Sequence, residues 1–272
     1  MEKQELALVV IGFDGYEDVW DHYFELLERF WPDNPFPVYL VNQEKRPNYK
    51  NVTIINCGAD AEWSKKAQAA VNQIDANYIC LLLEDFFAGE VIHTQEIQDT
   101  LEWIIKEQIR YYKLFTFSKI TTPLYKGISY LHTIPENMDY GISLQASIWE
   151  RSFLKETLGE DNYNAWIFEA NRLSDSKNAT SSEAMQGCVY DSRNILKIQH
   201  GIVQSKYLPK TVKYFEKMGY SLDTTKREVM KGKSYRMYQI KKAAGNLPKG
   251  LKPIVKKTMK VFGMKFVSDQ GK

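Results

Sequence analysis

Apolar and polar residues follow one another along the first third of the chain in blocks of two kinds. Short runs that are almost wholly apolar and rich in Val, Ile and Leu are typical of strands buried on both faces. The sequence predicts such strands at 6–13, 36–43, 51–58 and 78–83. Longer segments with apolar residues at helical spacing lie between them and predict helices at 18–31 and 62–74. This alternation predicts an α/β fold with a mostly parallel sheet covered by helices on both sides.

The pattern changes after the fourth predicted strand. It predicts a helix at 95–107, a strand at 113–118, regular structure again at 143–149 and a helix at 150–158, with a turn-rich segment at 119–142. Beyond residue 204 the segments become basic and amphipathic. We therefore expect two parts, a larger α/β domain at 1–204 and a basic helical appendage at 205–272.

Charge is distributed unevenly between these two parts. The net charge is only +2, yet residues 205–272 hold 18 Lys or Arg and 4 Asp or Glu, which leaves 18 basic and 30 acidic residues in 1–204. Residues 251–266 mix five lysines with large apolar residues, a composition typical of a helix on an anionic membrane surface. A helix packed on the domain with solvated lysines is the alternative. No nucleic-acid-binding motif accompanies the charge, so nucleic acid is not an expected partner.

The cysteines and the N-terminus indicate the compartment. Cys57, Cys80 and Cys188 form no CxxC pair and each lies in or beside an apolar run, which predicts reduced, buried thiols. The first residues do not have the pattern of a secretory signal, and no apolar run approaches the roughly 18 residues that cross a bilayer. We expect a cytoplasmic protein that attaches peripherally to the inner face of the cell membrane.

The stretch "YICLLLEDFFAGE" places Glu84 and Asp85 directly after the fourth strand. In an open parallel sheet, ligands bind beyond the carboxyl ends of the strands. Carboxylate oxygens are suitable ligands for Mg²⁺ or Mn²⁺ that arrives with a diphosphate, and Phe86 and Phe87 would wall a partly dry site. The alternative is that one carboxylate caps the next helix or pairs with a lysine while the other is solvated.

The order of these elements resembles the GT-A fold of nucleotide-sugar-dependent glycosyltransferases. Four segments within residues 6–205 are similar to small family 2-like bacterial transferases of capsule, exopolysaccharide or lipopolysaccharide synthesis: "WSKKAQAAVNQI", "LLLEDFF", "SLQASIW" and "NAWIFE". In that family a DxD motif holds the divalent cation on the sugar-nucleotide diphosphate. This chain has "EDF" instead, with Phe86 at the second aspartate position, so Asp85 is the expected principal ligand.

The resemblance implies a metal-dependent transfer of a sugar from a UDP-sugar to a saccharide acceptor, with inversion at the transferred sugar carbon. The expected acceptor is a lipid-linked saccharide. It implies Glu169 as the base that takes the acceptor hydroxyl's proton, with Asp161 and Asp175 as competitors, since an aromatic setting raises a carboxyl pKa toward that task. A helix-surface glutamate beside core aromatics is the structural alternative. His200 is implied as a further ligand of Mn²⁺ or Mg²⁺ beside Asp85 and Glu84.

Two more groups of residues complete the expected site. The predicted nucleotide-binding residues follow the first and third strands: Phe13, Asp14, Asp60, Trp63 and Lys66. The predicted acceptor platform consists of Gln145, Trp149 and Trp166, because aromatic faces suit sugar rings. For Trp63 and for the platform residues, packing in the core is the open alternative.

Two other function classes stay open at the level of sequence. A nucleotidyltransferase acting on sugar phosphates also places acidic residues and Mg²⁺ on an α/β sheet, but it usually carries a basic, glycine-rich loop after its first strand, and "GFDGYED" is acidic. A non-catalytic peripheral membrane scaffold would need only the basic appendage.

Overall fold

The computed structural model describes residues 4–115 and 120–245, and its centre is one sheet of eight strands. The strands are β1 Gln4–Ile11, β2 Val38–Asn42, β3 Val52–Asn56, β4 Ala76–Leu83, β6 Tyr111–Lys113, β7 Leu131–Pro135, β8 Ser147–Glu150 and β9 Ala184–Asp191, in the order β3-β2-β1-β4-β8-β6-β9-β7. Four of the seven neighbouring pairs are parallel, including all three in the β3-β2-β1-β4 half. The predicted mixed α/β class with a mostly parallel sheet is confirmed.

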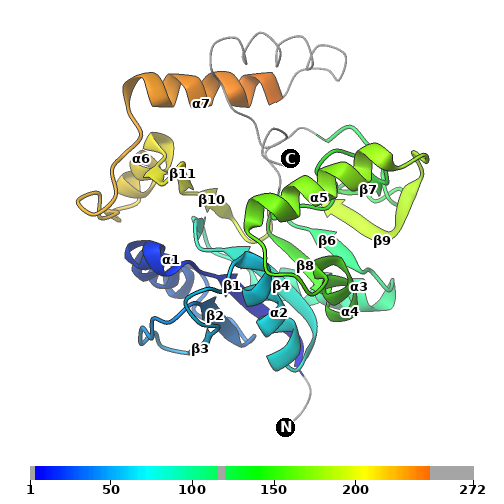
Figure 1. Cartoon of the computed structure of the whole chain (residues 1–272), viewed down its shortest axis with the longest axis horizontal. Helices are drawn as coiled ribbons and strands as arrows, with labels where there is room; N and C mark the ends of the chain where they lie inside the picture. Colours follow the sequence, from blue (N-terminus) through cyan, green and yellow to red (C-terminus); the bar gives the residue numbers. More distant parts are fainter. Residues whose placement is uncertain (1–3, 116–119, 246–272) are drawn as a thin grey trace.

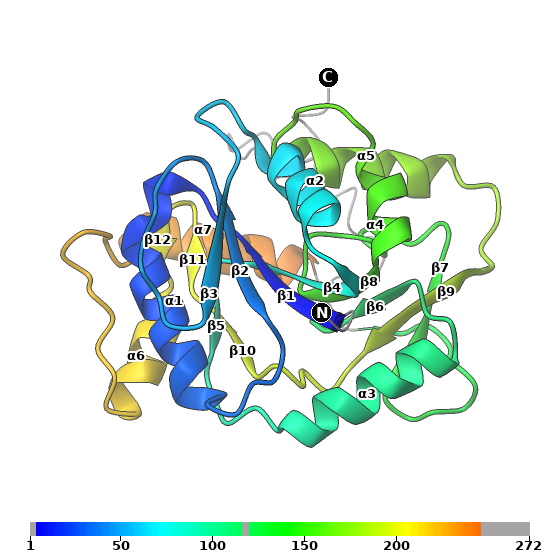
Figure 2. The same ribbon diagram turned by 90° about the horizontal axis from the view of Figure 1, so that it is seen from below.

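Helices cover both faces of this sheet (Figures 1 and 2). Helices α1 Glu17–Phe30 and α3 Thr94–Lys106 lie over one face, and α2 Trp63–Gln73, α4 Arg151–Leu158 and α5 Ala165–Asn178 lie over the other. Helices α6 Pro209–Lys217 and α7 Gly232–Gly245 lie beyond the sheet. In β1, Leu6, Leu8 and Val10 enter the core under α1 and α3, while alternate residues enter the core under α2 and α4. Strand side chains alternate between faces, so a nearly continuous apolar run is what two buried faces require.

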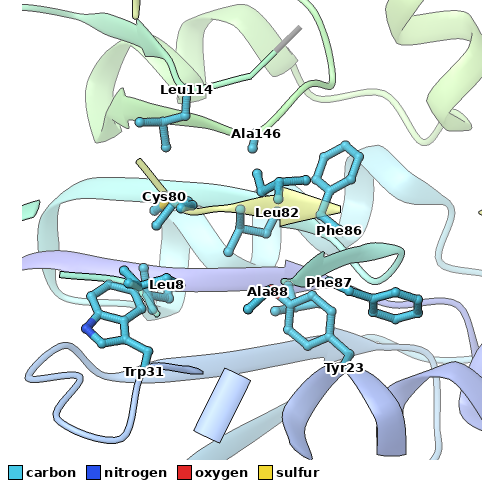
Figure 3. Packing of buried hydrophobic residues seen from close by; sticks show 14 of the residues in the cluster. Leu8, Tyr23, Trp31, Cys80, Leu82, Phe86, Phe87, Ala88, Leu114 and Ala146 are labelled. Carbon is cyan, nitrogen blue, oxygen red and sulfur yellow. The ribbon is translucent and has the colours of Figure 1, made fainter. Parts of the chain in front are cut away.

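Two short ribbons extend the architecture beyond the main sheet. Strand β5 (Phe86–Ala88) pairs antiparallel with β10 (Ile198–His200), and β11 (Ile202–Val203) pairs with β12 (Lys206–Tyr207). Figure 3 shows Phe86 and Phe87 among the buried side chains of the core under α1 and α3. The two phenylalanines after the acidic pair therefore belong to a strand that brings residues 198–200 to the end of β4.

The observed elements differ from the predicted ones mainly between residues 111 and 150. The predicted strand at 113–118 overlaps the observed β6 (Tyr111–Lys113) only at Lys113, and residues 116–119 lie outside the described part of the chain. Strand β8 begins at Ser147 rather than at 143, and the turn-rich segment contains β7. Strands β6 and β7 are short and pair with β9, which lies far along the chain. Long-range pairing of this kind leaves little local periodicity for a sequence pattern to detect.

The first part of the basic appendage belongs to the main core. Tyr207, Phe215 and Tyr220 lie in the same cluster as α1, and the Phe215 ring packs edge-on against Phe87 at 5.9 Å. The Arg227 guanidinium binds Asp18 of α1 at 2.8 Å. The predicted boundary at 204/205 therefore does not separate two cores. The predicted membrane helix at 251–266 lies outside the described residues, and within those residues no helix is long and apolar enough to span a membrane.

Replacement of Phe215 by alanine tests this docking. The ring is fully buried, so Phe215→Ala is expected to lower the free energy of unfolding by about 3–5 kcal/mol. Exposed Lys213 on the same helix supplies the matched control, since Lys213→Ala is expected to change stability by less than about 0.5 kcal/mol. Denaturant unfolding measures both values, and equal stabilities would contradict a shared core.

Candidate active site

The strand order changes direction between β1 and β4. From β1 the chain adds β2 and β3 on one side and then returns to place β4 on the other side. Ile11 and Leu83, the last residues of the two strands, are partners in the parallel register. In open α/β sheets the crevice beyond the carboxyl ends at such a switch point is where ligands bind. The residues that follow β1 and β4 are therefore the natural place to look for a site.

Glu84 is buried at this switch point and links the segments around it. Its side chain is 9% exposed, and its Oε2 accepts a hydrogen bond from the backbone N–H of Phe13 at 2.9 Å and another from the Trp20 indole. Burial raises the pKa of the Glu84 carboxyl to about 8, although these two donors and the nearby Lys66 oppose the rise. Glu84 thus links β4, the loop after β1 and helix α1.

Asp85 and His200 form a pair beside Glu84. The Nε2 atom of His200 lies 2.8 Å from Oδ2 of Asp85, and the backbone N–H of Gly201 donates to the Asp85 carbonyl at 2.8 Å. The β5–β10 ladder holds His200 in this position, opposite Phe86 in the register. The structure therefore brings together two of the three predicted metal ligands from positions 115 residues apart in the sequence.

The third predicted ligand does not join them. Within residues 4–115 and 120–245, no group of three or more His, Cys, Asp or Glu side chains is arranged to hold a metal ion, and the Glu84 carboxyl is engaged by Phe13 and Trp20. One carboxylate and one imidazole nevertheless fit a divalent cation that arrives with a diphosphate, because the substrate's own oxygens and water complete the coordination. Glu84, predicted as a ligand, instead links the loop after β1 to α1 through its Oε2 atom.

Glu169 lies on α5 and faces the same edge of the sheet. Its Oε1 accepts a hydrogen bond from the backbone N–H of Leu144 at 2.7 Å, while in the described part of the chain its buried Oε2 has no hydrogen-bond partner. Ser147 pairs with Leu81 of β4, so Leu144 lies beyond it toward the carboxyl end of β4. Burial raises the pKa of Glu169, and the Leu144 N–H and Lys113 partly offset this. A carboxylate with one oriented oxygen and one unpaired oxygen is suited to accept a proton.

Two loops carry further predicted residues to this edge. Asn162 donates to the carbonyl of Asp60 at 2.9 Å and accepts from the backbone N–H of Glu62 at 3.0 Å, which ties the loop before α2 to the loop before α5. Asn164 caps α5 by accepting from two backbone N–H groups of its first turn. Trp166 then projects from that turn and is 56% exposed. Trp166 and Asp60, both predicted from sequence, are thus carried by two loops that are bonded to each other.

Phe13 is an exposed aromatic residue directly after β1. Its ring is 50% exposed and lies 5.9 Å from the Lys66 ammonium, which donates to the carbonyl of Gly12 at 2.7 Å. Lys66 is only 4% exposed, and burial lowers its pKa against the influence of Glu84. Instead of reaching a phosphate as predicted, Lys66 holds the loop after β1 through the Gly12 carbonyl. The exposed Phe13 ring can stack on a ligand.

Three other predicted residues have structural roles. Trp149 is fully buried against the Tyr111 ring at 4.4 Å, so the prediction of an acceptor platform there is wrong. The Trp63 ring packs on Phe168 in the core, with the ring centroids 4.9 Å apart, so the alternative of core packing holds for Trp63. Asp14 accepts hydrogen bonds from Asn42 and from three successive backbone N–H groups, 43–45. Burial would raise the Asp14 pKa, but these donors hold it below its ordinary value. Asp14 thus joins the loops after β1 and β2.

Gln145 and Lys113 belong to the same edge: Gln145 follows Leu144, which donates to Glu169, and Lys113 ends β6. The side-chain oxygen of Gln145 is buried and, among the described residues, has no hydrogen-bond partner, which leaves it available to a ligand donor. Lys113, which the sequence reasoning did not select, is buried at the carboxyl end of β6. A lysine inside the apolar run "YYKLF" was a visible signal, since buried lysines need a partner.

A separate cavity of about 880 Å³ opens on the α1 side of Asp14. Most of the charges around it are already paired: Glu17 with Lys45, Asp18 with Arg227, and Lys206 with Glu228. Of the predicted nucleotide-binding residues it includes Asp14 alone. This cavity is therefore beside the candidate site and does not define it.

Comparisons with known proteins give distant structural likenesses. No protein-family model matches the sequence, and no curated protein sequence matches it significantly. The crystal structure of S. aureus TarS 1-349 is similar with a TM-score of 0.41 and 14% identity, over 70% of this chain and 60% of that one. TarS 1-349 in complex with UDP-GlcNAc gives a TM-score of 0.41 and 12% identity, over 79% and 65%. A cytidylyltransferase from Leptospira borgpetersenii gives 0.36 and 12%, over 57% and 63%. At these scores nothing about function follows from the likeness.

The Glu84 carboxyl gives the site a measurable pH dependence. Its folded-state pKa of about 8 exceeds the ordinary value of 4.5, so between these values the folded protein holds a proton that the unfolded chain releases. The free energy of unfolding is therefore expected to fall as pH rises from about 5 to about 8. Glu84→Gln keeps an oxygen acceptor for Phe13 and Trp20 but removes the titration. Its melting temperature is expected to exceed that of the wild type at pH 9 by about 5 °C, or about 2 kcal/mol.

The control for this measurement is Glu102→Gln, on the exposed face of α3. It is expected to follow the wild-type dependence of melting temperature on pH. Parallel curves for the wild type and Glu84→Gln between pH 5 and 9 would show that Glu84 is not titrating in the folded protein.

Proposed function

We propose that this protein is a glycosyltransferase that moves a sugar from a UDP-sugar to a saccharide acceptor in bacterial surface-polysaccharide synthesis, with inversion at the transferred carbon. The observation that carries the proposal is the presence of two groups at the same carboxyl edge of an α/β sheet: the half-buried Glu169, which has one hydrogen-bonded oxygen, and the Asp85–His200 pair. This edge thus holds a carboxylate suited to accept a proton and a donor set suited to a cation with its diphosphate.

The proposed division of labour follows from where each group lies. Phe13 stacks on the nucleotide base at the end of β1, and the exposed Trp166 offers a flat surface to the acceptor ring. Asp85 and His200 would hold Mn²⁺ or Mg²⁺, and such a cation would supply positive charge opposite the departing diphosphate. Glu169 is half-buried, and its Oε2 atom is shielded from bulk solvent.

In the proposed reaction Glu169 Oε2 takes the proton of the acceptor hydroxyl while the oxygen of that hydroxyl bonds to the sugar carbon. The bond between that carbon and the UDP oxygen breaks, and the electron pair leaves with UDP. The Leu144 N–H holds Oε1, so the carboxyl group presents Oε2 in a fixed direction. A base positioned in this way contributes typically 10²–10⁴-fold to a rate.

The acceptor is proposed to be lipid-linked, which would place the enzyme at the inner face of the cell membrane. Lysines and an arginine of α7, including exposed Lys233 and Arg236, continue the basic character of residues 205–272. Polybasic segments next to apolar side chains favour anionic membrane surfaces.

Replacement of Glu169 tests the assignment of the base. Glu169→Gln is expected to lower turnover by about 10²–10⁴-fold because the amide cannot take a proton, while the affinity for UDP-sugar changes little. The competitors Asp161 and Asp175 are both exposed, and Asp175 binds Arg172 at 2.9 Å. Asp161→Asn and Asp175→Asn are therefore expected to keep turnover within a few-fold. A Glu169→Gln enzyme as fast as these two would rule out Glu169.

Thermal-shift measurements with UDP-, GDP- and CMP-sugars, with and without Mn²⁺, test the donor and the cation. A UDP-sugar is expected to raise the melting temperature only when Mn²⁺ is present, since ligand that binds the folded state stabilises it. Asp85→Asn is expected to abolish the Mn²⁺-dependent part. Asp75→Asn is the control, because Asp75 is exposed and precedes the opposite end of the same strand.

The other function classes predict different outcomes in this experiment. Stabilisation by nucleoside triphosphates in preference to nucleotide sugars would indicate a nucleotidyltransferase. A melting temperature that responds to no nucleotide would indicate a non-catalytic scaffold.

A further inference from the structure

The turn at residues 140–144 is held by three side chains from other elements. Lys113 Nζ donates to the carbonyls of Tyr140 at 2.6 Å and Gly141 at 3.3 Å, and the Tyr111 hydroxyl lies 3.4 Å from both the nitrogen and the carbonyl oxygen of Ser143. The third contact is the bond from the Leu144 N–H to Glu169. Lys113 and Tyr111 come from β6 and Glu169 comes from α5, so both elements form hydrogen bonds to the same turn.

The turn itself has little freedom to move. Tyr140 has a positive φ of 58°, which a non-glycine residue adopts only when its surroundings fix it. At Gly141 an added Cβ would lie 2.7 Å from a methyl group of Ile134. The Lys113 amino group satisfies two carbonyls in this conformation, and its removal would leave them without these donors.

Lys113 is also a buried positive charge that interacts electrostatically with Glu169. It is 3% exposed, and burial lowers its pKa to about 8 while Glu169 opposes the fall. Among the described residues, the titratable groups that influence Glu169 or are influenced by it are Lys113 and Tyr111 from β6 and Tyr140 from the turn. Lys113 is the one of these that is positively charged, and a nearby opposite charge favours the ionised carboxylate.

We infer that Lys113 is the positioning residue of the candidate base: it fixes the 140–144 turn that orients Glu169 through the Leu144 N–H, and its charge favours the ionised form of the half-buried Glu169 carboxyl. This inference rests on the proposed function for its catalytic meaning. The contacts on which it is built are independent of that function. Glu169 receives the proton, and Lys113 acts through Glu169.

The direct test is the titration of the Glu169 carboxyl by NMR of protein labelled with ¹³C at glutamate Cδ, with the signal assigned by its loss in Glu169→Gln. Lys113→Met removes both the charge and the hydrogen bonds. Lys113→Gln removes the charge but keeps amide donors for the carbonyls of Tyr140 and Gly141. In both variants the Glu169 titration is expected to move upward by about one pH unit.

The matched control is Lys126→Met, which removes an exposed lysine that pairs with Glu107. It is expected to leave the Glu169 titration unchanged. Lys113→Arg retains the charge and is also expected to titrate as the wild type. An unchanged Glu169 titration in a folded Lys113→Gln protein would overturn the inference, and so would a failure of both neutral variants to fold, because Lys113 would then serve the fold alone.

Transfer kinetics add the catalytic consequence. The acidic limb of the kcat/KM profile against pH is expected to move upward with the Glu169 titration in Lys113→Gln, so that activity below the limb falls by about tenfold relative to the wild type. The NMR titration needs no substrate. A wild-type protein without transfer activity would therefore refute the proposed function and leave the test of Lys113 intact, whereas a shifted titration without a shifted limb would overturn the positioning role.

Discussion

The contact between the carboxyl of Glu84 and the backbone N–H of Phe13 is the constraint on which the candidate site depends. It joins the ends of β1 and β4 at the point where the strand order reverses, and the Trp20 indole binds the same oxygen from α1. A buried carboxyl without donors would be costly, so these two bonds explain how it is tolerated there. With Glu84 directed inward, the next residue, Asp85, becomes the carboxylate that meets His200 at the edge.

The rest of the site is assembled around this edge by contacts between distant segments. Strand β5 recruits β10 and with it His200, the loop before α5 is bonded to the loop before α2, and the turn before β8 orients Glu169. Helix α6 packs behind the β5–β10 ribbon through Phe215 and Phe87, so the first part of the basic segment supports the site as well as adding charge. The candidate site thus depends on two core clusters whose described residues run from Leu6 to Leu222.

Sequence reasoning captured the local features of this arrangement and missed those that depend on tertiary contacts. The strands 6–13 and 78–83 were predictable because two buried faces require continuous apolar runs, and the acidic pair at the end of β4 was visible in the same stretch. Trp149 was misjudged because an aromatic residue in a strand looks the same whether it faces a ligand or the core. The inward direction of Glu84 is set by Trp20 and Phe13, which no local pattern connects to it. The Leu144 N–H is a backbone group and leaves no mark in the sequence.

The central claim is that a nucleotide diphosphate and a divalent cation bind beyond the ends of β1 and β4, at Asp85. A crystal structure of the protein with Mn²⁺ and a UDP-sugar, with the anomalous signal of manganese recorded, tests it most directly. We expect one manganese peak bonded to Asp85 and to the diphosphate, with the base of the nucleotide against Phe13. A structure with the nucleotide bound elsewhere, and with Asp85 still paired to His200 and no manganese beside it, would rule out a nucleotide and metal site at this edge.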